Sequence, residues 1–292
     1  MDETRRVRAI MVFVVLAFAF SSVFYALMIA SGHIGGGKGW YATGLEWCPA
    51  AGVLLTCALL RIDIGTIGWR WRPWRWQILA YATPLLFCLI GYVAVWAAGL
   101  GGFPNGETVD SLKAALGIPS LSTSQVILLW TFLSLTAGTV RSTASALGEQ
   151  IGWSGFLSPR LAERYGFTRA ALITGAVCAT WHFPILFFSD FFDSPPPVWF
   201  WLPCFVIELL GLSVIILWLR LRSGSVWTGA LVHASINLWN QDFFAPLTAP
   251  HGAITNYTID ESGFMLPLVI SITAYLFWRQ RAAVLPAERV SA

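Results

Sequence analysis

Four polar side chains stand in otherwise apolar stretches of the sequence and have types suited to acid–base chemistry. Glu149 lies in LGEQIGWSGFL, His182 in CATWHFPI, and His233 and Asn237 in LVHASINLW. A carboxylate and imidazoles together can activate a water molecule, hold a metal ion or relay protons. Because His233 and Asn237 are four residues apart, their side chains share one face of a helix. We therefore take these four residues as the candidate site.

The composition predicts that helices crossing a membrane position these residues. The 292-residue chain is 57% hydrophobic and 11% charged, with a mean hydropathy of +0.67. Soluble domains carry about 25% charged residues. The net charge of +3 is too small to indicate nucleic-acid binding. We expect an all-α polytopic membrane protein that is in contact with lipid and binds no nucleic acid.

Eight apolar stretches are long enough to be membrane helices. The first follows MDETRRVR; it is too long for a secretory signal and ends in a poor cleavage site, so we expect it to be retained. No internal repeat or linker divides the chain, and residues 1–292 are expected to form a single integral membrane domain. The predicted spans are 9–30, 44–61, 77–99, 125–148, 170–189, 198–219, 225–245 and 263–279.

The basic residues predict how these spans are oriented. If the ends alternate from a cytoplasmic N-terminus, 15 of the 18 basic residues fall on the cytoplasmic side, as the positive-inside rule requires. We therefore expect a multi-pass protein of the cell membrane with both termini cytoplasmic, and we name the cytoplasmic helix ends inner and the others outer. Lys38 and Lys113 fall outside, and Arg141 lies within the fourth span. The inner residues are Arg5, Arg6, Arg8, Arg61, Arg70, Arg72, Arg75, Arg160, Arg164, Arg169, Arg220, Arg222, Arg279, Arg281 and Arg289.

Depth along the predicted helices brings the candidate residues together. Counted from the inner ends, Glu149, His182 and His233 lie about 14, 18 and 12 Å deep. The hydrocarbon core is about 30 Å thick, so all three are near the midplane on three different helices. Each residue alone could serve only as a helix–helix hydrogen bond. Their common depth favours a shared polar pocket, because polar groups in lipid need partners.

Three further acidic residues in or near the spans are interpreted differently. Glu208, in CFVIELLGL, is expected to be a structural hydrogen bonder. Glu46 and Asp242 stand near outer helix ends and are expected to be solvated. None of the three is included in the candidate site.

The stretches GEQIGWSGFLSPRL, ATWHFP and LVHASIN resemble the three motifs of the CPBP family of intramembrane proteases. That family includes the type II CAAX prenyl endopeptidases and bacteriocin-processing or immunity proteins. Its pattern is EExxxR, then FxxxH, then HxxxN or HxxxD. Order, helix placement and spacing agree, and the resemblance marks residues 125–245 as a CAAX-protease-like catalytic core.

The resemblance implies a role for each of the four candidate residues. Glu149 activates a water molecule, and His182 helps to hold that water. His233 and Asn237 stabilise the oxyanion that forms when the water attacks a peptide carbonyl. We therefore expect an intramembrane endopeptidase acting on a peptide or membrane-protein substrate.

Three positions depart from the family pattern. Gln150 replaces the second glutamate, Ser154 replaces the motif arginine, and Cys178 replaces the phenylalanine. The lost glutamate and arginine are an opposite-charge pair, so their joint loss can be compensatory. We expect Gln150 and Ser154 to support the site, and the departures put catalytic activity in question.

Two questions stay open from the sequence. We favour a metal-free glutamate mechanism, and a zinc ion held by Glu149, His182 and His233 is the alternative. An inactive relative that acts as a peptide-binding, immunity or regulatory scaffold is the second functional reading, and a proton-coupled transporter is the third. Arginine outnumbers lysine 16 to 2, which suggests a GC-rich genome and a bacterial source.

Overall fold

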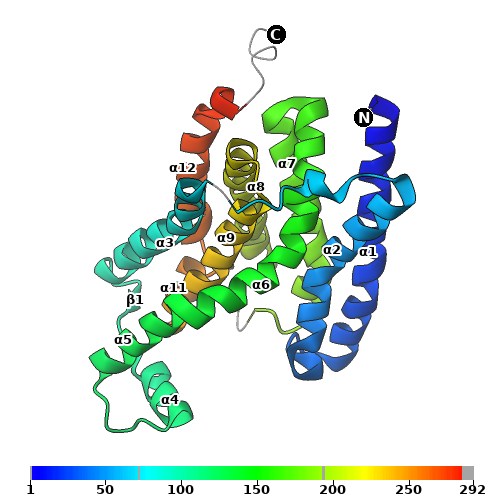
Figure 1. Ribbon diagram of the computed structural model, residues 1–292. Coiled ribbons are helices and arrows are strands. Elements are labelled where there is room, and N and C mark those ends of the chain that lie inside the picture. Colours follow the sequence, from blue (N-terminus) through cyan, green and yellow to red (C-terminus); the bar gives the residue numbers. More distant parts are fainter. Residues whose placement is uncertain (1, 72, 193–194, 285–292) are drawn as a thin grey trace.

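Helices occupy the places where the hydropathy predicts membrane spans (Figure 1). The computed structural model describes residues 2–71, 73–192 and 195–284. The long helices are α1 (Glu3–Ser31), α2 (Trp40–Leu60), α3 (Trp74–Ala97), α7 (Ser158–Phe188) and α8 (Val198–Ser223). The shorter ones are α4 (Gly106–Leu116), α5 (Thr123–Leu133), α6 (Thr139–Gln150), α9 (Val226–Ile236), α10 (Ala245–Leu247), α11 (Ala253–Thr258) and α12 (Met265–Arg279).

Five helical stretches of the described chain are long and apolar enough to cross a membrane, judged by length and composition. One of them, Thr123–Phe188, contains 66 residues and includes two of the predicted spans. α12 is a shorter apolar helix, and α9 with the segment after it replaces the predicted span 225–245. The all-α polytopic membrane fold is confirmed, and each of the eight predicted spans corresponds to helical structure.

Three segments are wound more loosely, as π-helix: η3 (Ser134–Gly138), η4 (Ile151–Leu157) and η5 (Asn237–Phe244). π turns occur often at functional sites, and here η4 follows Gln150 directly while η5 begins at Asn237. The remaining short elements are the 3₁₀ turns η1 (Gly36–Gly39), η2 (Ile64–Ile67) and η6 (Arg281–Val284), and the antiparallel strands β1 (Gly101–Gly102) and β2 (Ala249–Pro250).

The long stretch Thr123–Phe188 reverses direction within α7, at Gly166. This residue has φ +76° and ψ 174°, a backbone conformation that glycine adopts without the steric cost of a Cβ atom. The residues before Gly166 approach the N-terminus of α1, where Arg164 contacts Glu3. The residues after it run back to the opposite end of the bundle (Figure 1). Two antiparallel membrane helices therefore arise from one apolar stretch.

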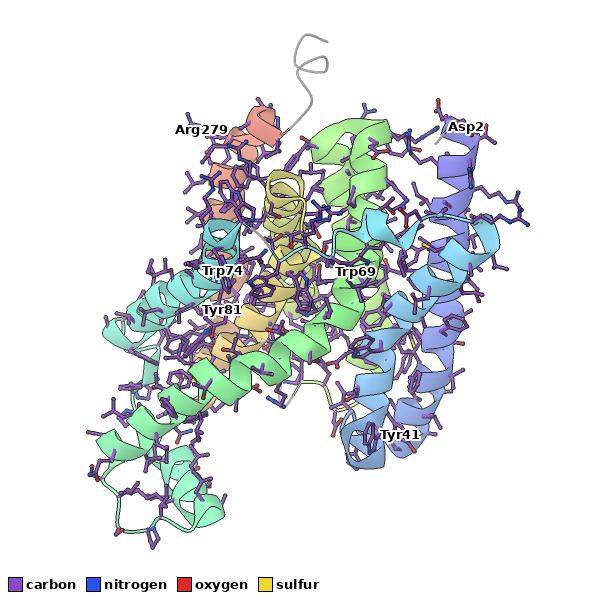
Figure 2. All side chains as sticks on the ribbon, viewed as in Figure 1. Asp2, Tyr41, Trp69, Trp74, Tyr81 and Arg279 are labelled. Atoms are coloured by element: carbon purple, nitrogen blue, oxygen red, sulfur yellow. The ribbon has the colours of Figure 1, made fainter. Side chains whose placement is uncertain are left out.

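The predicted inner helix ends gather at one end of the bundle, which we name the basic end. Arg5 donates to the Leu60 carbonyl at 2.7 Å, and Trp278 donates to Thr168 at 3.0 Å. Figure 2 shows Asp2 and Arg279 at this end and Tyr41 at the opposite, loop end. The grouping of the helix ends is as predicted, whereas the membrane side that each end faces stays a prediction. Arg72 and Arg289 lie outside the described residues.

α6 packs on α2 with almost no space between the two backbones. A Cβ atom added at Gly148 would lie 2.6 Å from the Glu46 carbonyl oxygen and 3.0 Å from the Trp47 Cα atom. These are backbone atoms of α2, which cannot move without shifting the helix. Gly148 therefore allows the close approach that places α2 against the end of α6.

We expect Gly148→Ala to destabilise the protein, because the added methyl group must push α6 away from α2. Overpacking of this kind costs about 1–3 kcal/mol, so the melting temperature in detergent should fall. Gly106→Ala is the matched control, since a Cβ atom at Gly106 meets no atom within 4 Å. Equal melting temperatures for the two variants would contradict this packing argument.

Candidate active site

One cavity inside the bundle, about 210 Å³ in volume, brings the predicted site residues together. Glu149 and Gln150 enter from the end of α6, Ser154 from η4 and His182 from α7. His233 and Asn237 enter from α9 and the start of η5. The convergence expected from depth alone is thus seen in the structure, while the catalytic roles stay predictions.

Glu149 is held from within its own helical segment. It is 4% exposed, and the Trp153 indole donates to its Oε2 atom at 3.2 Å. The Trp153 ring packs edge-on against Trp181, with ring centroids 5.9 Å apart. Glu149 also interacts electrostatically with His182. The carboxylate is therefore fixed in position, with one oxygen engaged by the indole and an imidazole nearby.

His182 has its proton position set by the backbone of α7. Its Nδ1 atom lies 2.8 Å from the Cys178 carbonyl oxygen, one helical turn earlier. Because a carbonyl only accepts, Nδ1 must carry the hydrogen, and the neutral ring then has its lone pair on Nε2. The rings of Trp181 and Phe205 pack edge-on against the imidazole, at 4.8 and 5.5 Å between centroids. The ring is thereby held with Nε2 as its free acceptor.

His233 has the opposite arrangement. The Gln150 amide nitrogen lies 3.2 Å from His233 Nδ1. Since the amide nitrogen donates, Nδ1 accepts and the neutral ring carries its hydrogen on Nε2. The two histidines are thus set as an acceptor and a donor. Gln150, which stands where the family pattern has a second glutamate, fixes the donor form.

Ser154, which stands where the family pattern has an arginine, fits a narrow contact between η4 and α9. Its hydroxyl is fully buried and donates to the Gln150 carbonyl at 3.1 Å. A Cβ atom at Gly229 would lie 2.3 Å from Ser154 Oγ. Small residues on both sides of this contact bring α9, and with it His233, close to Gln150.

Three carboxylates that the sequence analysis left out of the site also line the cavity: Glu46, Glu208 and Glu261. Glu46 is partly exposed, as expected, and it also faces the cavity because the contact at Gly148 brings α2 against α6. The prediction that Glu208 is a structural hydrogen bonder is wrong. Its Oε2 atom is buried and has no hydrogen-bond partner among the described residues. The sequence shows that α2 and α8 each carry a glutamate, but it does not show which face of each helix points into the cavity.

Arg141 does not extend to the site. It forms an ion pair with Asp242 on η5 at 2.5 Å, and the two side chains are 73% and 42% exposed. Arg141 is thus not positioned to replace the motif arginine beside Glu149. Asp242 is partly exposed, as expected, but it is paired with Arg141.

The donor set for a zinc ion does not form. Across residues 2–71, 73–192 and 195–284, no three histidine, cysteine, aspartate or glutamate side chains are grouped so as to hold a metal ion. A catalytic zinc needs three such ligands on one ion. The zinc alternative with Glu149, His182 and His233 as ligands therefore finds no fitting site in the described residues.

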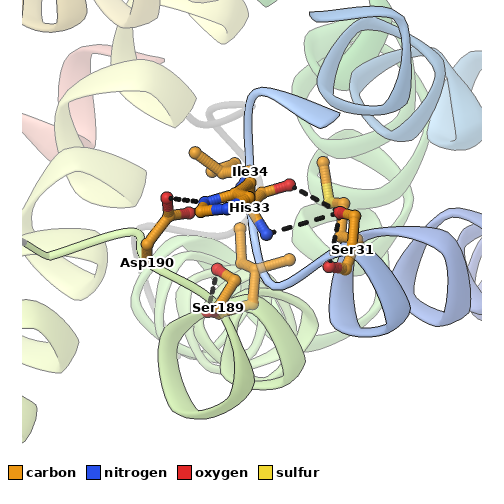
Figure 3. Close-up of polar contacts among 7 residues, drawn as sticks. Ser31, His33, Ile34, Ser189 and Asp190 are labelled. Carbon is orange, nitrogen blue, oxygen red and sulfur yellow. Dashed lines mark hydrogen bonds and ion pairs between the residues drawn. The ribbon is translucent and has the colours of Figure 1, made fainter. Parts of the chain in front are cut away.

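Figure 3 shows a polar clamp at the loop end, made by His33, Ile34 and Asp190. Asp190 accepts a hydrogen bond from the Ile34 backbone N–H at 2.6 Å and pairs with His33 Nδ1 at 2.9 Å. Ile34 and Phe191, on the two sides of this clamp, both line the cavity. The bonds from His33 and Ile34 hold the pKa of Asp190 below its usual value, so this carboxylate keeps its charge in more acidic solution than a free aspartate.

Glu261 and its neighbour Asp260 form an acidic corner in the loop before α12. Gln241 donates to Glu261 at 2.5 Å, and Asn240 donates to Asp260 at 2.8 Å. Burial, followed by the nearby charge of Asp260, raises the pKa of Glu261 to about 8. Two consecutive amides of η5 thus hold two consecutive carboxyl groups of the loop, and Glu261 is largely protonated at neutral pH.

With this geometry in place, comparison with known proteins supports a class. Residues 124–239 match the model of the family described as Type II CAAX prenyl endopeptidase Rce1-like. This segment includes all six predicted site residues, and the resemblance inferred from the motifs is confirmed. The matched segment is thus similar to a family of prenyl endopeptidases, and it covers less than half of the chain.

One curated relative is similar beyond this segment. The chain is 28% identical over 197 residues to CAAX prenyl protease 2 of Methanococcus maripaludis, an alignment that covers 66% of this chain and 65% of the relative. The match thus spans slightly less than two thirds of the relative's length.

We expect Asp190→Ala to open the cavity rim, because it removes both bonds of the clamp. In a background with the other four cysteines replaced by alanine, Cys178, which lines the cavity, should react faster with a water-soluble maleimide. Asp110→Ala is the control, since it removes a surface pair with Lys113 at 3.2 Å on α4. An unchanged labelling rate in Asp190→Ala would show that the clamp does not limit access.

We expect Glu261→Gln to flatten the pH dependence of stability. With the pKa raised from 4.5 to about 8, the folded protein keeps a proton that the unfolded chain releases. Its stabilising effect is complete below pH 4.5 and is lost as the pH rises toward 8. Melting temperatures between pH 5 and 8.5 should fall more in the wild type than in the variant. Glu107→Gln, an exposed change on α4, should behave like the wild type; a Glu261→Gln curve parallel to the wild type would contradict the assignment.

Proposed function

We propose that this protein is an intramembrane endopeptidase that hydrolyses a peptide bond with a water molecule activated by Glu149. The observation that carries the proposal is the convergence of Glu149, His182, His233 and Asn237 on one cavity within the bundle. The two histidines have complementary hydrogen-bonding states there. The match to a protease family supports the class of reaction.

Glu149 acts as the base in this mechanism. Water enters the cavity between the Glu149 carboxylate and the Nε2 lone pair of His182, each of which accepts one of its hydrogens. As the water oxygen attacks the scissile carbonyl, its proton passes to Glu149. A positioned base of this kind contributes about 10²–10⁴-fold to the rate. The protonated Glu149 then gives the proton to the departing amine, which balances the reaction.

His233 and Asn237 meet the negative charge that develops on the carbonyl oxygen. His233 carries its hydrogen on Nε2 because Gln150 donates to Nδ1, so Nε2–H is available to donate to the oxyanion. Asn237 lines the cavity four residues later and supplies an amide N–H. Gln150 acts through His233 by fixing its donor form, which gives the departure from the family pattern a defined purpose.

The substrate is expected to be a peptide or membrane protein that reaches the cavity from the lipid bilayer. The names of the family and of the relative refer to prenylated CAAX substrates, and activity on such substrates is one branch of this proposal. We place the protein in the cell membrane, with its basic end cytoplasmic, because basic residues collect on that side of membrane proteins.

An inactive scaffold is the competing function, favoured by the replacements at Gln150 and Ser154. Both side chains nevertheless make contacts that support the proposed active site. Gln150 orients His233, and Ser154 permits close packing of α9. The mechanism does not need the motif arginine, and these contacts favour the enzyme over the scaffold.

We expect Glu149→Gln to abolish proteolysis while preserving the fold, since the amide keeps the shape and cannot take up the proton. Membrane-proteome peptide termini should be compared among cells carrying wild type, a deletion, or Glu149→Gln at equal expression. Termini seen only with the wild type identify substrates. Asn237→Ala should reduce their formation by about 10²–10³-fold, the usual effect of losing one oxyanion donor.

The same comparison separates the enzyme from the scaffold. If the wild type and Glu149→Gln give identical termini while the deletion alone has a phenotype, catalysis is ruled out. The Gly106→Ala protein, altered in α4 away from the cavity, provides the matched active control.

A further inference from the structure

The cavity extends beyond the catalytic residues toward the basic end. Thr174, Cys178 and His182 follow one another at intervals of four on α7, and all three line the cavity. Thr174 is thus about 12 Å from His182 along the helix axis. Gln150, Ser154 and Ser158, at the end of α6, on η4 and at the start of α7, form a second such row. We name the part of the cavity lined by Ser158, Thr174 and Glu208 the inner arm.

Buried oxygen atoms without partners gather in the inner arm. Ser158 Oγ, Thr174 Oγ1 and Glu208 Oε2 are all buried and have no hydrogen-bond partner among the described residues. Their residues are 2%, 4% and 2% exposed. Leaving such groups unsatisfied in an apolar bundle is costly, most of all for a carboxylate. A ligand that donates hydrogen bonds removes this cost.

Glu208 lies close to the catalytic centre along α8. It follows by one turn the residue Phe205, whose ring packs on His182, which places it about 4.5 Å further along the axis. On the facing helix, a Cβ atom at Gly175 would lie 2.9 Å from Leu210 Cα. Counted from this contact, Thr174 lies about 4.5 Å nearer the basic end than Glu208 on the two closely packed helices. A long side chain from a substrate bound at His182 therefore meets Glu208 first and Thr174 beyond it.

The charge of the cavity specifies the kind of ligand. Among the described residues, four glutamates line it, namely Glu46, Glu149, Glu208 and the largely protonated Glu261, and no lysine or arginine does. Ammonium and guanidinium groups donate several hydrogen bonds and accept none. A carboxylate with two hydroxyls is a matching set of acceptors. An anionic group has no cationic partner on this lining.

We propose that Glu208, with the hydroxyls of Ser158 and Thr174, binds the side chain of a lysine or arginine next to the scissile bond of the substrate. This assignment rests on the proposed function, because it names the substrate class of the same cavity. The substrate is thus a membrane-associated peptide segment with a basic residue at the cleavage site. Glu208 is a binding residue that determines specificity and takes no part in proton transfer.

The test uses the full chain in proteoliposomes and internally quenched apolar peptides. At one position, scanned along otherwise identical peptides, these carry arginine, its neutral isostere citrulline, lysine or norleucine. Rates are compared for the wild type, Glu149→Gln, Glu208→Gln and Cys204→Ser. Cys204→Ser is the matched control, since Cys204 lies one turn before Glu208 on α8 and does not line the cavity.

We expect the wild type to cleave the arginine peptide with a kcat/KM about 10-fold or more above that of the citrulline peptide, the effect typical of a hydrogen-bonded charge. Glu208→Gln should lower the rate for the arginine peptide and leave the citrulline peptide unchanged, so that the two rates become nearly equal. Cys204→Ser should keep the wild-type preference for arginine. Thr174→Val, which removes only a hydroxyl, should reduce the preference several-fold. This second variant keeps the test valid if Glu208→Gln does not fold.

Two results would overturn the proposal. One is a wild type that does not distinguish arginine from citrulline. The other is a Glu208→Gln protein that slows every peptide equally, which would indicate a packing role. If no peptide is cleaved in a Glu149-dependent manner, the proposed function fails. A separate ligand-binding measurement then tests whether the inner arm binds a basic side chain.

For that purpose, N-acetylarginine amide should raise the melting temperature of the wild type, and N-acetylcitrulline amide should not. The rise should vanish in Glu208→Gln. Equal effects of both compounds would overturn the proposal. The proposal would also be overturned if potassium or sodium chloride alone stabilised the wild type but not Glu208→Gln. That result would indicate that the inner arm binds an inorganic cation.

Discussion

The cost of an unpartnered polar group inside an apolar bundle governs how this protein is arranged. Many buried polar groups of the bundle bind one another. Tyr92 donates to Asn240 at 2.6 Å, and Asn240 donates to Asp260. At the basic end, Arg160 donates to the Phe156 carbonyl at 2.9 Å and lies over the Phe156 ring. Around the cavity, Ser158, Thr174 and Glu208 each have a buried oxygen without a hydrogen-bond partner among the described residues. The proposed binding of a basic side chain uses these oxygens.

The same constraint explains how a helical bundle can hold a precise catalytic geometry. Three of the four proposed catalytic side chains are fixed by a neighbour from their own helix or from the next one: Glu149 by Trp153, His182 by the Cys178 carbonyl, and His233 by Gln150. These contacts set which nitrogen of each imidazole carries the hydrogen before any substrate arrives. Preorganised donors of this kind do not need to reorient as charge develops.

Much of this could be predicted from the sequence, because hydropathy and the distribution of arginine depend on the chain alone. Helical structure at each span, the grouping of helix ends and the convergence of Glu149, His182 and His233 all followed from counting residues along helices. The involvement of Glu46 and Glu208 could not be predicted, because it depends on the rotation of α2 and α8 about their axes. The small residues that set these rotations, such as Gly148, are common in membrane helices and do not specify which face they cover. Glu261 was missed for a different reason, since the loop before α12 folds back onto η5.

The π-helical winding of η4 and η5 bears on how such chains diverge. A π turn closes each hydrogen-bonded ring with one residue more than an α turn. A relative with one residue fewer in either segment can therefore keep both flanking helices in place, while the side chains in between rotate by about 100°. Such a change would exchange the residues at the cavity wall without disturbing the bundle. Loss or gain of a single residue in η4 or η5 can thus change the specificity of the cavity. An alignment that forbids gaps inside helices would overlook such a change.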